Sequence, residues 1–298
     1  MIINRIFVHY KQDYTMRKMS RLYCAFAAAL LLGACESSVE DSARALLDKA
    51  GNEYSAGNYN AARLLIDSIK TTYPKAYKTR REAELMRREV LLKEKERDLD
   101  FYRETIASLA LQRDSISKTL TYNKDSRFQD AGVYTAPSQA MALNPFNSFL
   151  RASVKENGDT YITSLYRGKR ISHKGVRVSA GDSFVDCNTP FLARSYKELG
   201  VYNERLDFKY GTDGGIMDFI AASAGPFKVK LEGSNGEYEY TLRHDDVLAI
   251  SDVLALSKVL RAIEEARKME GEAQRALEFL IRSQERSTAA NASEDVEQ

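Results

Sequence analysis

The 298-residue sequence predicts an α+β protein, in which an antiparallel β-rich unit lies between two long helical segments. Three observations predict this class. Residues 75–120 contain neither proline nor glycine, residues 146–243 repeatedly alternate apolar and polar side chains, and residues 247–263 carry a wide apolar stripe. Alternation is typical of strands with one buried face, whereas a stripe that recurs at helical spacing is typical of a helix packed on a core.

The first 34 residues have the composition of an export signal. Arg17, Lys18 and Arg21 form a short basic region, and the 13 residues of segment 22–34 carry no charge. A membrane-spanning helix needs roughly 20 apolar residues, so this run is too short to cross a bilayer. A basic start, a short apolar run and small residues at its end are typical of a signal that is removed after export.

The segment ends in Leu32, Gly33, Ala34 and Cys35, and these residues resemble the lipobox of bacterial lipoproteins. The resemblance implies that the Cys35 thiol carries a diacylglyceryl group, that the chain is cut before Cys35, and that the new amine is acylated. Two or three acyl chains hold a protein firmly on a membrane, whereas one holds it only marginally. The resemblance therefore implies a lipid-anchored protein of the bacterial cell envelope, with residues 35–43 as its tether. The alternative is an ordinary signal in which Cys35 has no role.

Glu36 bears on which membrane would hold the anchor. Among bacterial lipoproteins an aspartate at this position commonly signals retention in the inner membrane. The sequence has glutamate instead, so the resemblance favours the outer membrane.

The chain that this cleavage would leave is nearly neutral. The sequence has 44 basic and 42 acidic residues, and its first 34 residues hold five of the basic and one of the acidic ones, which leaves a net charge of −2. Such a balance gives no global argument for nucleic-acid binding. Cys24 would leave with the signal, so Cys187 would be the one thiol without a lipid, and no internal disulfide is expected. We interpret Cys187 as a small buried hydrophobe.

Residues 44–74 have the pattern of two helices joined by a short turn, and they resemble one tetratricopeptide repeat. The matching positions lie in the second half of that motif: Gly57, Tyr59, Ala62, Ile66, Ile69 and Pro74. Lys49, Ala50 and Glu53 depart from its first half, and no second copy follows. Because a lone hairpin cannot bury its own apolar face, we expect it to pack on the next helix.

That next helix completes a helical region over residues 44–121. Its apolar side chains recur every seven residues, at Leu85, Leu92, Leu99 and Ile106. A second apolar position appears in its later half, at Tyr102, Leu109 and Ile116. A half-kept heptad pattern predicts pairing with another helix along part of the length. Residues 122–145 are rich in Asn, Asp, Ser and Pro and are expected to form a linker.

Residues 146–244 are expected to form the β-rich domain. Strands are predicted within residues 159–166, 174–178 and 183–186, and short helices over 191–199 and 216–222. The clearest hairpin covers residues 227–243, where Asn235-Gly236 provides a favourable turn. Residues 245–286 predict the C-terminal helix, capped by Asp245 or Asp246, and residues 287–298 a disordered tail.

The sequence contains no motif of a common hydrolase, metalloprotease or nucleotide-binding loop, and we expect no catalytic residue, no metal and no cofactor. His173 and His244 lie in different strand regions. The glycine-rich residues 211–215 are interpreted as a turn. Five aspartates could supply a carboxylate pair: Asp182, Asp186, Asp207, Asp213 and Asp218. Seven tyrosines could line a glycan or peptide groove, although alternation favours the core for most: Tyr161, Tyr166, Tyr196, Tyr202, Tyr210, Tyr238 and Tyr240.

Three functional hypotheses follow. The first is a lipid-anchored, non-catalytic scaffold, attached to the membrane through Cys35, that binds a protein partner or itself through its helices. The second is an envelope lipoprotein that binds a glycan, a peptide or a small molecule. The third is an envelope hydrolase that uses acidic residues. Lipoproteins with similar repeats often belong to outer-membrane assembly or transport machines, and this is what the resemblance implies for partners.

Overall fold

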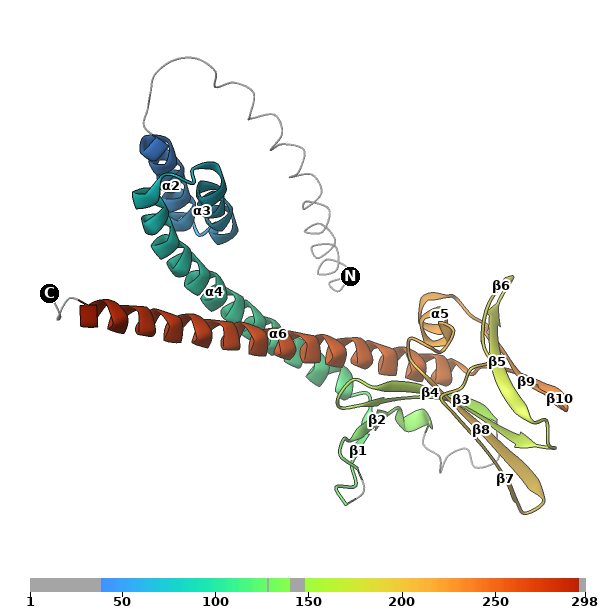
Figure 1. Cartoon of the computed structure of the whole chain (residues 1–298). Coiled ribbons are helices and arrows are strands. Elements are labelled where there is room, and N and C mark those ends of the chain that lie inside the picture. The colour runs from blue at the N-terminus through green and yellow to red at the C-terminus, as the bar shows by residue number, and fades with distance from the viewer. Residues whose placement is uncertain (1–38, 128, 140–147, 295–298) are drawn as a thin grey trace. The chain divides into compact units, whose positions relative to one another are not determined.

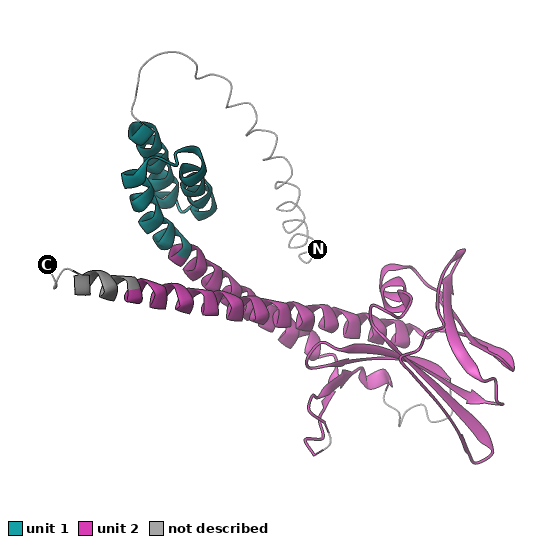
Figure 2. Cartoon of the chain, viewed as in Figure 1, with its two compact units in different colours: residues 1–91 teal, residues 92–298 magenta. Residues whose placement is uncertain are grey.

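The computed structural model describes residues 39–127, 129–139 and 148–294. It confirms the predicted α+β class, with long helices in the N-terminal and C-terminal parts of the chain and antiparallel strands between them (Figure 1). The chain divides into two compact units, residues 1–91 and 92–298 (Figure 2). The boundary falls within one long helix, α4 (Tyr77–Ser117). The lipobox residues Leu32, Gly33, Ala34 and Cys35 lie outside the described residues.

Unit 1 is a helical hairpin against which the start of α4 packs. The hairpin consists of α2 (Val39–Ser55) and α3 (Tyr59–Thr72). Small side chains, Ala43, Ala50 and Ala62, are fully buried between the helices and permit their close approach. Ile66 and Ile69 complete the core together with Ala83 and Val90 of α4. The apolar face that the hairpin cannot bury alone is thus covered by α4, as expected.

The first turn of α4 is held on the hairpin by a carboxylate from α2. The backbone N–H groups of Lys78 and Thr79 donate to Glu40 over 3.2 Å each, and the Thr79 hydroxyl donates over 2.7 Å. These hydrogen bonds, led by that of the Thr79 hydroxyl, lower the pKa of Glu40. An acceptor at this place satisfies amides that have no partner within the helix, and its negative charge suits the positive end of the helix dipole.

Gly57, in the turn between α2 and α3, has a backbone angle φ of +77°. An L side chain in this left-handed region costs about 1–2 kcal/mol. We therefore expect Gly57→Ala to destabilise unit 1 by about 1–2 kcal/mol in urea unfolding. Gly271→Ala is the control with the opposite sign, because Gly271 lies inside a helix, where alanine is favoured by about 0.5–1 kcal/mol. Equal effects of the two substitutions would contradict this account of the turn.

Unit 2 contains two antiparallel sheets. The strand order is β1-β2-β3-β4-β8-β7 in the six-stranded sheet and β10-β9-β5-β6 in the four-stranded sheet. The strands are β1 (Thr121–Asn123), β2 (Val133–Thr135), β3 (Phe149–Lys155), β4 (Thr160–Gly168), β5 (His173–Ala180), β6 (Ser183–Cys187), β7 (Leu192–Glu198), β8 (Val201–Lys209), β9 (Lys228–Gly233) and β10 (Gly236–Thr241).

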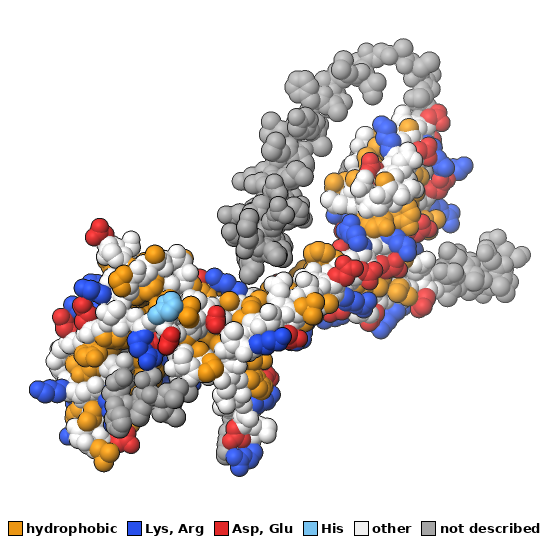
Figure 3. All heavy atoms as spheres, turned by 180° about the vertical axis from the view of Figure 1, so that it is seen from behind, with side chains coloured by type: hydrophobic (Ala, Val, Ile, Leu, Met, Phe, Trp, Pro, Cys, Tyr) orange, Lys and Arg blue, Asp and Glu red, His pale blue; other side chains and the backbone are white. Residues whose placement is uncertain are grey.

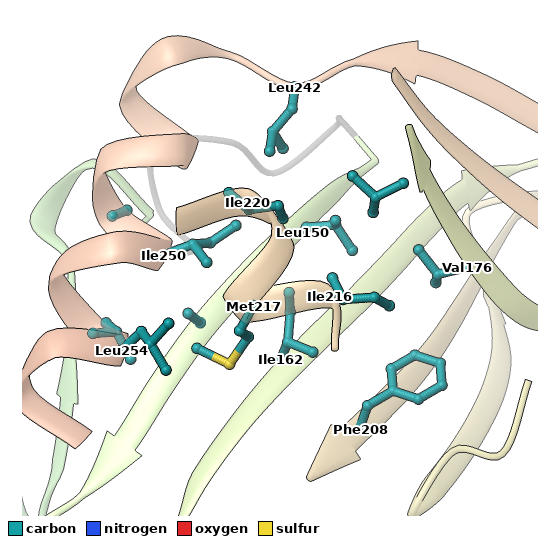
Figure 4. Close-up of a cluster of buried hydrophobic side chains, with 14 of the residues drawn as sticks. Leu150, Ile162, Val176, Phe208, Ile216, Met217, Ile220, Leu242, Ile250 and Leu254 are labelled. Carbon is teal, nitrogen blue, oxygen red and sulfur yellow. The ribbon is translucent and has the colours of Figure 1, made fainter. Parts of the chain in front are cut away.

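The core of unit 2 lies between the inner faces of the sheets and two helices, α5 (Ile216–Ala222) and α6 (His244–Glu294). Figure 4 shows how side chains from β3, β4, β5, β8, α5 and α6 converge there. Leu150 and Ile162 of the six-stranded sheet meet Ile216 of α5 and Ile250 of α6, and each is almost completely buried. Cys187 is also buried, as its interpretation as a small hydrophobe requires.

The later half of α4 belongs to unit 2 and contacts α6. Arg103 Nε donates to Glu270 over 3.1 Å, and Leu99 of the heptad pattern is buried. The terminal helices therefore meet at this point, as the two unmatched apolar stripes predict. Leu85, the first residue of the same pattern, is exposed instead.

Residues 191–199 were expected to form a helix, and this is wrong, because most of them form strand β7. Phe191, Ser195 and Leu199 have helical spacing, but the segment pairs along its whole length with β8, in a register that joins Leu192 to Asp207 and Glu198 to Val201. Tertiary strand pairing overrides the weak local pattern. The neighbouring prediction, a helix over residues 216–222, matches α5.

The segment expected as a linker, residues 122–145, contains elements of the fold. It includes β2 and the short 3-10 helix η1 (Pro137–Gln139). The buried amide of Gln139 donates to the Leu150 carbonyl oxygen and to Asp246, and it accepts from the backbone N–H of Ala152. One side chain thus ties the segment to β3 and α6. The final helix also continues beyond its expected end at residue 286, to Glu294.

Candidate functional site

The buried aspartates of unit 2 serve local structure. Asp207 accepts hydrogen bonds from Arg205 Nε at 2.9 and 3.0 Å and from the Thr163 hydroxyl at 2.5 Å. Asp213 accepts from the backbone N–H groups of Gly211 and Met217 at 3.2 and 3.0 Å. The Gly211 amide, which could have helped to cradle an anion, therefore binds Asp213, and the segment is the turn that leads into α5.

Two of the exposed aspartates, Asp186 and Asp218, are paired with cations. Asp186 accepts from Arg177 at 2.9 Å across β5 and β6, and Asp218 accepts from Lys258 of α6 at 2.9 Å. Asp182 lies in the turn between β5 and β6. A hydrolytic carboxylate pair needs two groups that face the same reacting atom. Four of the five aspartates instead have partners of their own in the described part of the chain, so the arrangement does not favour hydrolysis.

Ser164 of β4, His173 at the start of β5 and Glu204 of β8 lie close together, but they are not arranged as a catalytic site. Ser164 Oγ is 3.5 Å from His173 Nε2, and Ser164 is completely buried. Glu204 accepts from the backbone N–H groups of residues 171–173 at 3.2, 3.1 and 2.5 Å. The His173 Nδ1 atom has no partner among the described residues. A catalytic triad needs a reachable nucleophile and a histidine ring oriented by the carboxylate, and this cluster has neither. His244 begins α6, apart from this cluster in sequence.

The buried histidine gives a pH prediction. Burial lowers the pKa of His173, and the charge of Glu204 offsets part of this shift. The unfolded chain, with a histidine pKa of about 6.5, therefore binds more protons than the folded chain below that pH. The contribution to stability is complete above about pH 6.5 and is lost as the pH falls towards the lowered pKa.

We expect the urea midpoint of unit 2 to fall more steeply between about pH 7.5 and pH 5.5 in the native chain than in His173→Phe. The comparison of slopes removes the contribution of the carboxylates, which the two chains share. Parallel slopes would show that His173 is protonated equally in both states.

No family model, curated protein or solved structure matches the chain. The function therefore has to be inferred from the geometry of the described residues alone. Among these residues, no helix is both long and apolar enough to cross a membrane. No cluster of metal-ligating side chains occurs among them either.

The repeat-like residues of unit 1 form the packing of the hairpin. Tyr59 contacts Tyr54 with ring centroids 5.8 Å apart, and Pro74 follows the end of α3. Beside them, α3 and α4 border a groove of about 490 Å³. Its lining mixes basic, acidic and apolar side chains: Ile66, Asp67, Ile69, Lys70, Tyr77, Arg80, Arg81, Ala83, Glu84 and Arg87. Arg87 is paired with Asp67 across the groove, and basic residues outnumber acidic ones in its lining.

Leu199, the most exposed large apolar side chain among the described residues, lies on the hairpin of β7 and β8, called here the hairpin arm (residues 191–202). Every residue of β7 is exposed, which leaves this edge of the six-stranded sheet uncovered by the described residues. Phe191, Tyr196 and Leu199 of the arm are 68%, 55% and 93% exposed. An uncovered edge strand presents unpaired amide and carbonyl groups to any extended segment that approaches it.

Leu199 at the tip of the arm is unusual in a second way. It has a positive φ of 49°, followed by Gly200 at 85°. Such turns favour glycine, asparagine or aspartate, and a leucine there is strained. Because Leu199 is exposed, burial of its side chain within its own unit does not offset the free-energy cost of this strain. Strained residues that the fold does not need are candidates for function.

Sequence patterns alone did not reveal this arm, because the spacing of its apolar residues favours a helix. Of the seven tyrosines, Tyr166 is buried and Tyr240 has a buried hydroxyl, whereas Tyr196 and Tyr238 are exposed. Leu192, Arg194 and Tyr196 share one face of β7, and all residues of the strand are exposed, so no apolar–polar alternation marked it as a strand. Over the face shown in Figure 3, basic and acidic side chains are intermixed in both units, so no single-sign field dominates that surface.

Proposed function

We propose that the chain is a lipid-anchored protein of the bacterial cell envelope that acts as a non-catalytic scaffold. Cys35 provides the anchor, with the outer membrane as the favoured site, and the hairpin arm binds an extended segment of a protein partner. The observation that carries the proposal is Leu199, a strained and exposed leucine at the tip of an uncovered strand pair. Addition of a strand to an exposed sheet edge is a recurrent mode of peptide recognition.

The long helices offer a second contact surface for a partner or a second copy. Phe101 of α4 and Phe279 of α6 are exposed along unit 2. Single exposed apolar residues are common on protein surfaces, so they support the scaffold less strongly than the arm does.

The substitution Leu199→Asn tests partner binding without an expected loss of folding stability. Asparagine tolerates a positive φ, so we expect the variant to be at least as stable as the native chain in urea unfolding. Loss of a central apolar contact is expected to reduce the co-purified partner about tenfold or more, when the tagged chain is isolated from cross-linked native envelopes.

Leu111→Gln is the matched control, since it removes another exposed leucine, from α4, and should leave co-purification unchanged. Partner recovery that is equal for Leu199→Asn and the native chain would overturn the assignment of the arm. A specific loss with Leu111→Gln alone would move the contact to the helices.

A further inference from the structure

The outer face of the six-stranded sheet carries arginines from four strands: Arg151 of β3, Arg167 of β4, Arg205 of β8 and Arg194 of β7. Side chains alternate along a strand, and Leu150 of β3 and Leu206 of β8 are buried on the inner face. Their sequence neighbours Arg151 and Arg205 therefore lie on the outer face. In β7, Arg194 pairs directly with Arg205 and lies on the same face. Like charges that face each other directly across strands destabilise a sheet.

The charges of Arg151, Arg194 and Arg205 are poorly compensated by the described residues. Asp207 pairs with Arg205, but no carboxylate among the described residues forms an ion pair with Arg151 or Arg194. Arg151 is partly buried, and burial together with the charge of Arg205 lowers its pKa. Like charges that lie close together at a partly buried position destabilise the fold, unless a bound anion neutralises them.

A buried polar group on the same face also lacks a partner. Asn203 of β8 pairs in register with Tyr196 of β7 and lies one outer-face position from Arg205. The residue is 2% exposed, and its Nδ2 atom has no hydrogen-bond partner among the described residues. Buried amide donors are nearly always satisfied, so an unpaired one beside uncompensated arginines indicates a missing acceptor.

We propose that this outer face binds a phosphate ester through Arg151, Arg194 and Arg205, with the Asn203 amide as an additional donor. Three arginines and the one carboxylate of Asp207 leave two positive charges, which match the charge of −1.5 to −2 of a phosphate monoester. A carboxylate would neutralise only one of them. Guanidinium groups also bind phosphate oxygens through paired N–H donors. The exposed ring of Tyr196 lies beside the site and would contact the ester's organic part.

The phosphate ester could belong to a lipid headgroup or to a soluble molecule, and two probes separate these sources. Glycerol 3-phosphate is titrated calorimetrically into the Cys35→Ala chain, which has no acyl chain that could insert into a bilayer. The same chain is then tested for co-sedimentation with phosphatidylcholine vesicles that contain or lack phosphatidic acid.

Arg151→Gln with Arg194→Gln is the test variant. Hydrogen bonds between charged groups are stronger than neutral ones, so we expect the loss of two guanidinium groups to weaken binding about tenfold or more. Lys228→Gln with Lys230→Gln removes the same charge from the four-stranded sheet and should change binding less than about twofold. In the absence of ligand, the test variant should unfold at an equal or higher urea concentration than the native chain, because a repulsion is removed.

The outcomes discriminate clearly. Binding of glycerol 3-phosphate that depends on the arginines supports the site. Arginine-dependent binding to phosphatidic acid vesicles alone assigns it to a lipid headgroup. Binding of neither probe, equal losses in both double variants, or preference for polyglutamate over phosphate would overturn the proposal. None of these results depends on Leu199, on a protein partner or on lipidation.

Discussion

Replacement of Glu204 by alanine is expected to lower the free energy of unfolding of unit 2 by about 3–5 kcal/mol. The Glu204 side chain is almost completely buried, and its carboxylate accepts three backbone hydrogen bonds from residues 171–173. These amides belong to the segment that enters β5, the strand at which β6 and β9 join the four-stranded sheet. Without the carboxylate, several buried donors lose their acceptor, and each unsatisfied donor costs about 1–3 kcal/mol.

Urea unfolding of the full chain, followed by circular dichroism, measures this effect. Glu237→Ala is the matched control, because Glu237 is an exposed residue of β10 that pairs with Lys230 at the surface. An exposed ion pair contributes about 0–1 kcal/mol, so the control should unfold near the native midpoint. Equal stability of Glu204→Ala and Glu237→Ala would contradict this account, because the three amides would then not need the Glu204 carboxylate as their acceptor.

Replacement of Cys35 by alanine is expected to move the protein from the membrane fraction to the soluble fraction of the envelope. Each buried CH₂ group of an acyl chain contributes about 0.8 kcal/mol to membrane binding, and two or three chains make the attachment effectively stable. Alanine cannot form the thioether that carries the lipid. The membrane-bound fraction should therefore fall about tenfold or more, as measured by sedimentation and immunoblotting.

Cys187→Ala provides the control for this experiment. Cys187 is a buried free thiol of β6, and its removal should leave the protein in the membrane fraction. Mass analysis of the amino-terminal peptide adds a direct reading of the lipid. Retention of Cys35→Ala in the membrane fraction, with the native amino terminus unmodified, would contradict the anchor.

Much of the fold could be predicted from the sequence, where local pattern and tertiary environment agree. The hairpin of β9 and β10 is an example, because Val229 and Leu231 alternate with lysines and face Tyr240 and Tyr238 across the pair. Their two-residue period and the Asn235-Gly236 turn specify the structure locally. Helix α4 was equally clear, since a stretch without glycine or proline leaves few alternatives, and the apolar stripe of residues 247–263 predicted α6.

The remaining parts depend on partners distant in sequence. Strand β7 buries no face, so no alternation of burial marks it, and only its pairing with β8 makes it a strand. Glu204 stands in a strand with charged neighbours, and its role comes from amides more than thirty residues away. Arg194 and Arg205 become a site only because the register places them opposite each other. Short elements such as β2 are too brief for any period to appear.

The measurement that tests the scaffold most directly is site-specific photocross-linking in intact cells. A photoreactive residue replaces Tyr196 on the hairpin arm or, as the control, Leu111 on α4. The account predicts a discrete protein adduct from position 196 that disappears when Leu199→Asn is added, and no such adduct from position 111. An absence of adducts at position 196, or the same adducts from both positions regardless of Leu199, would contradict it.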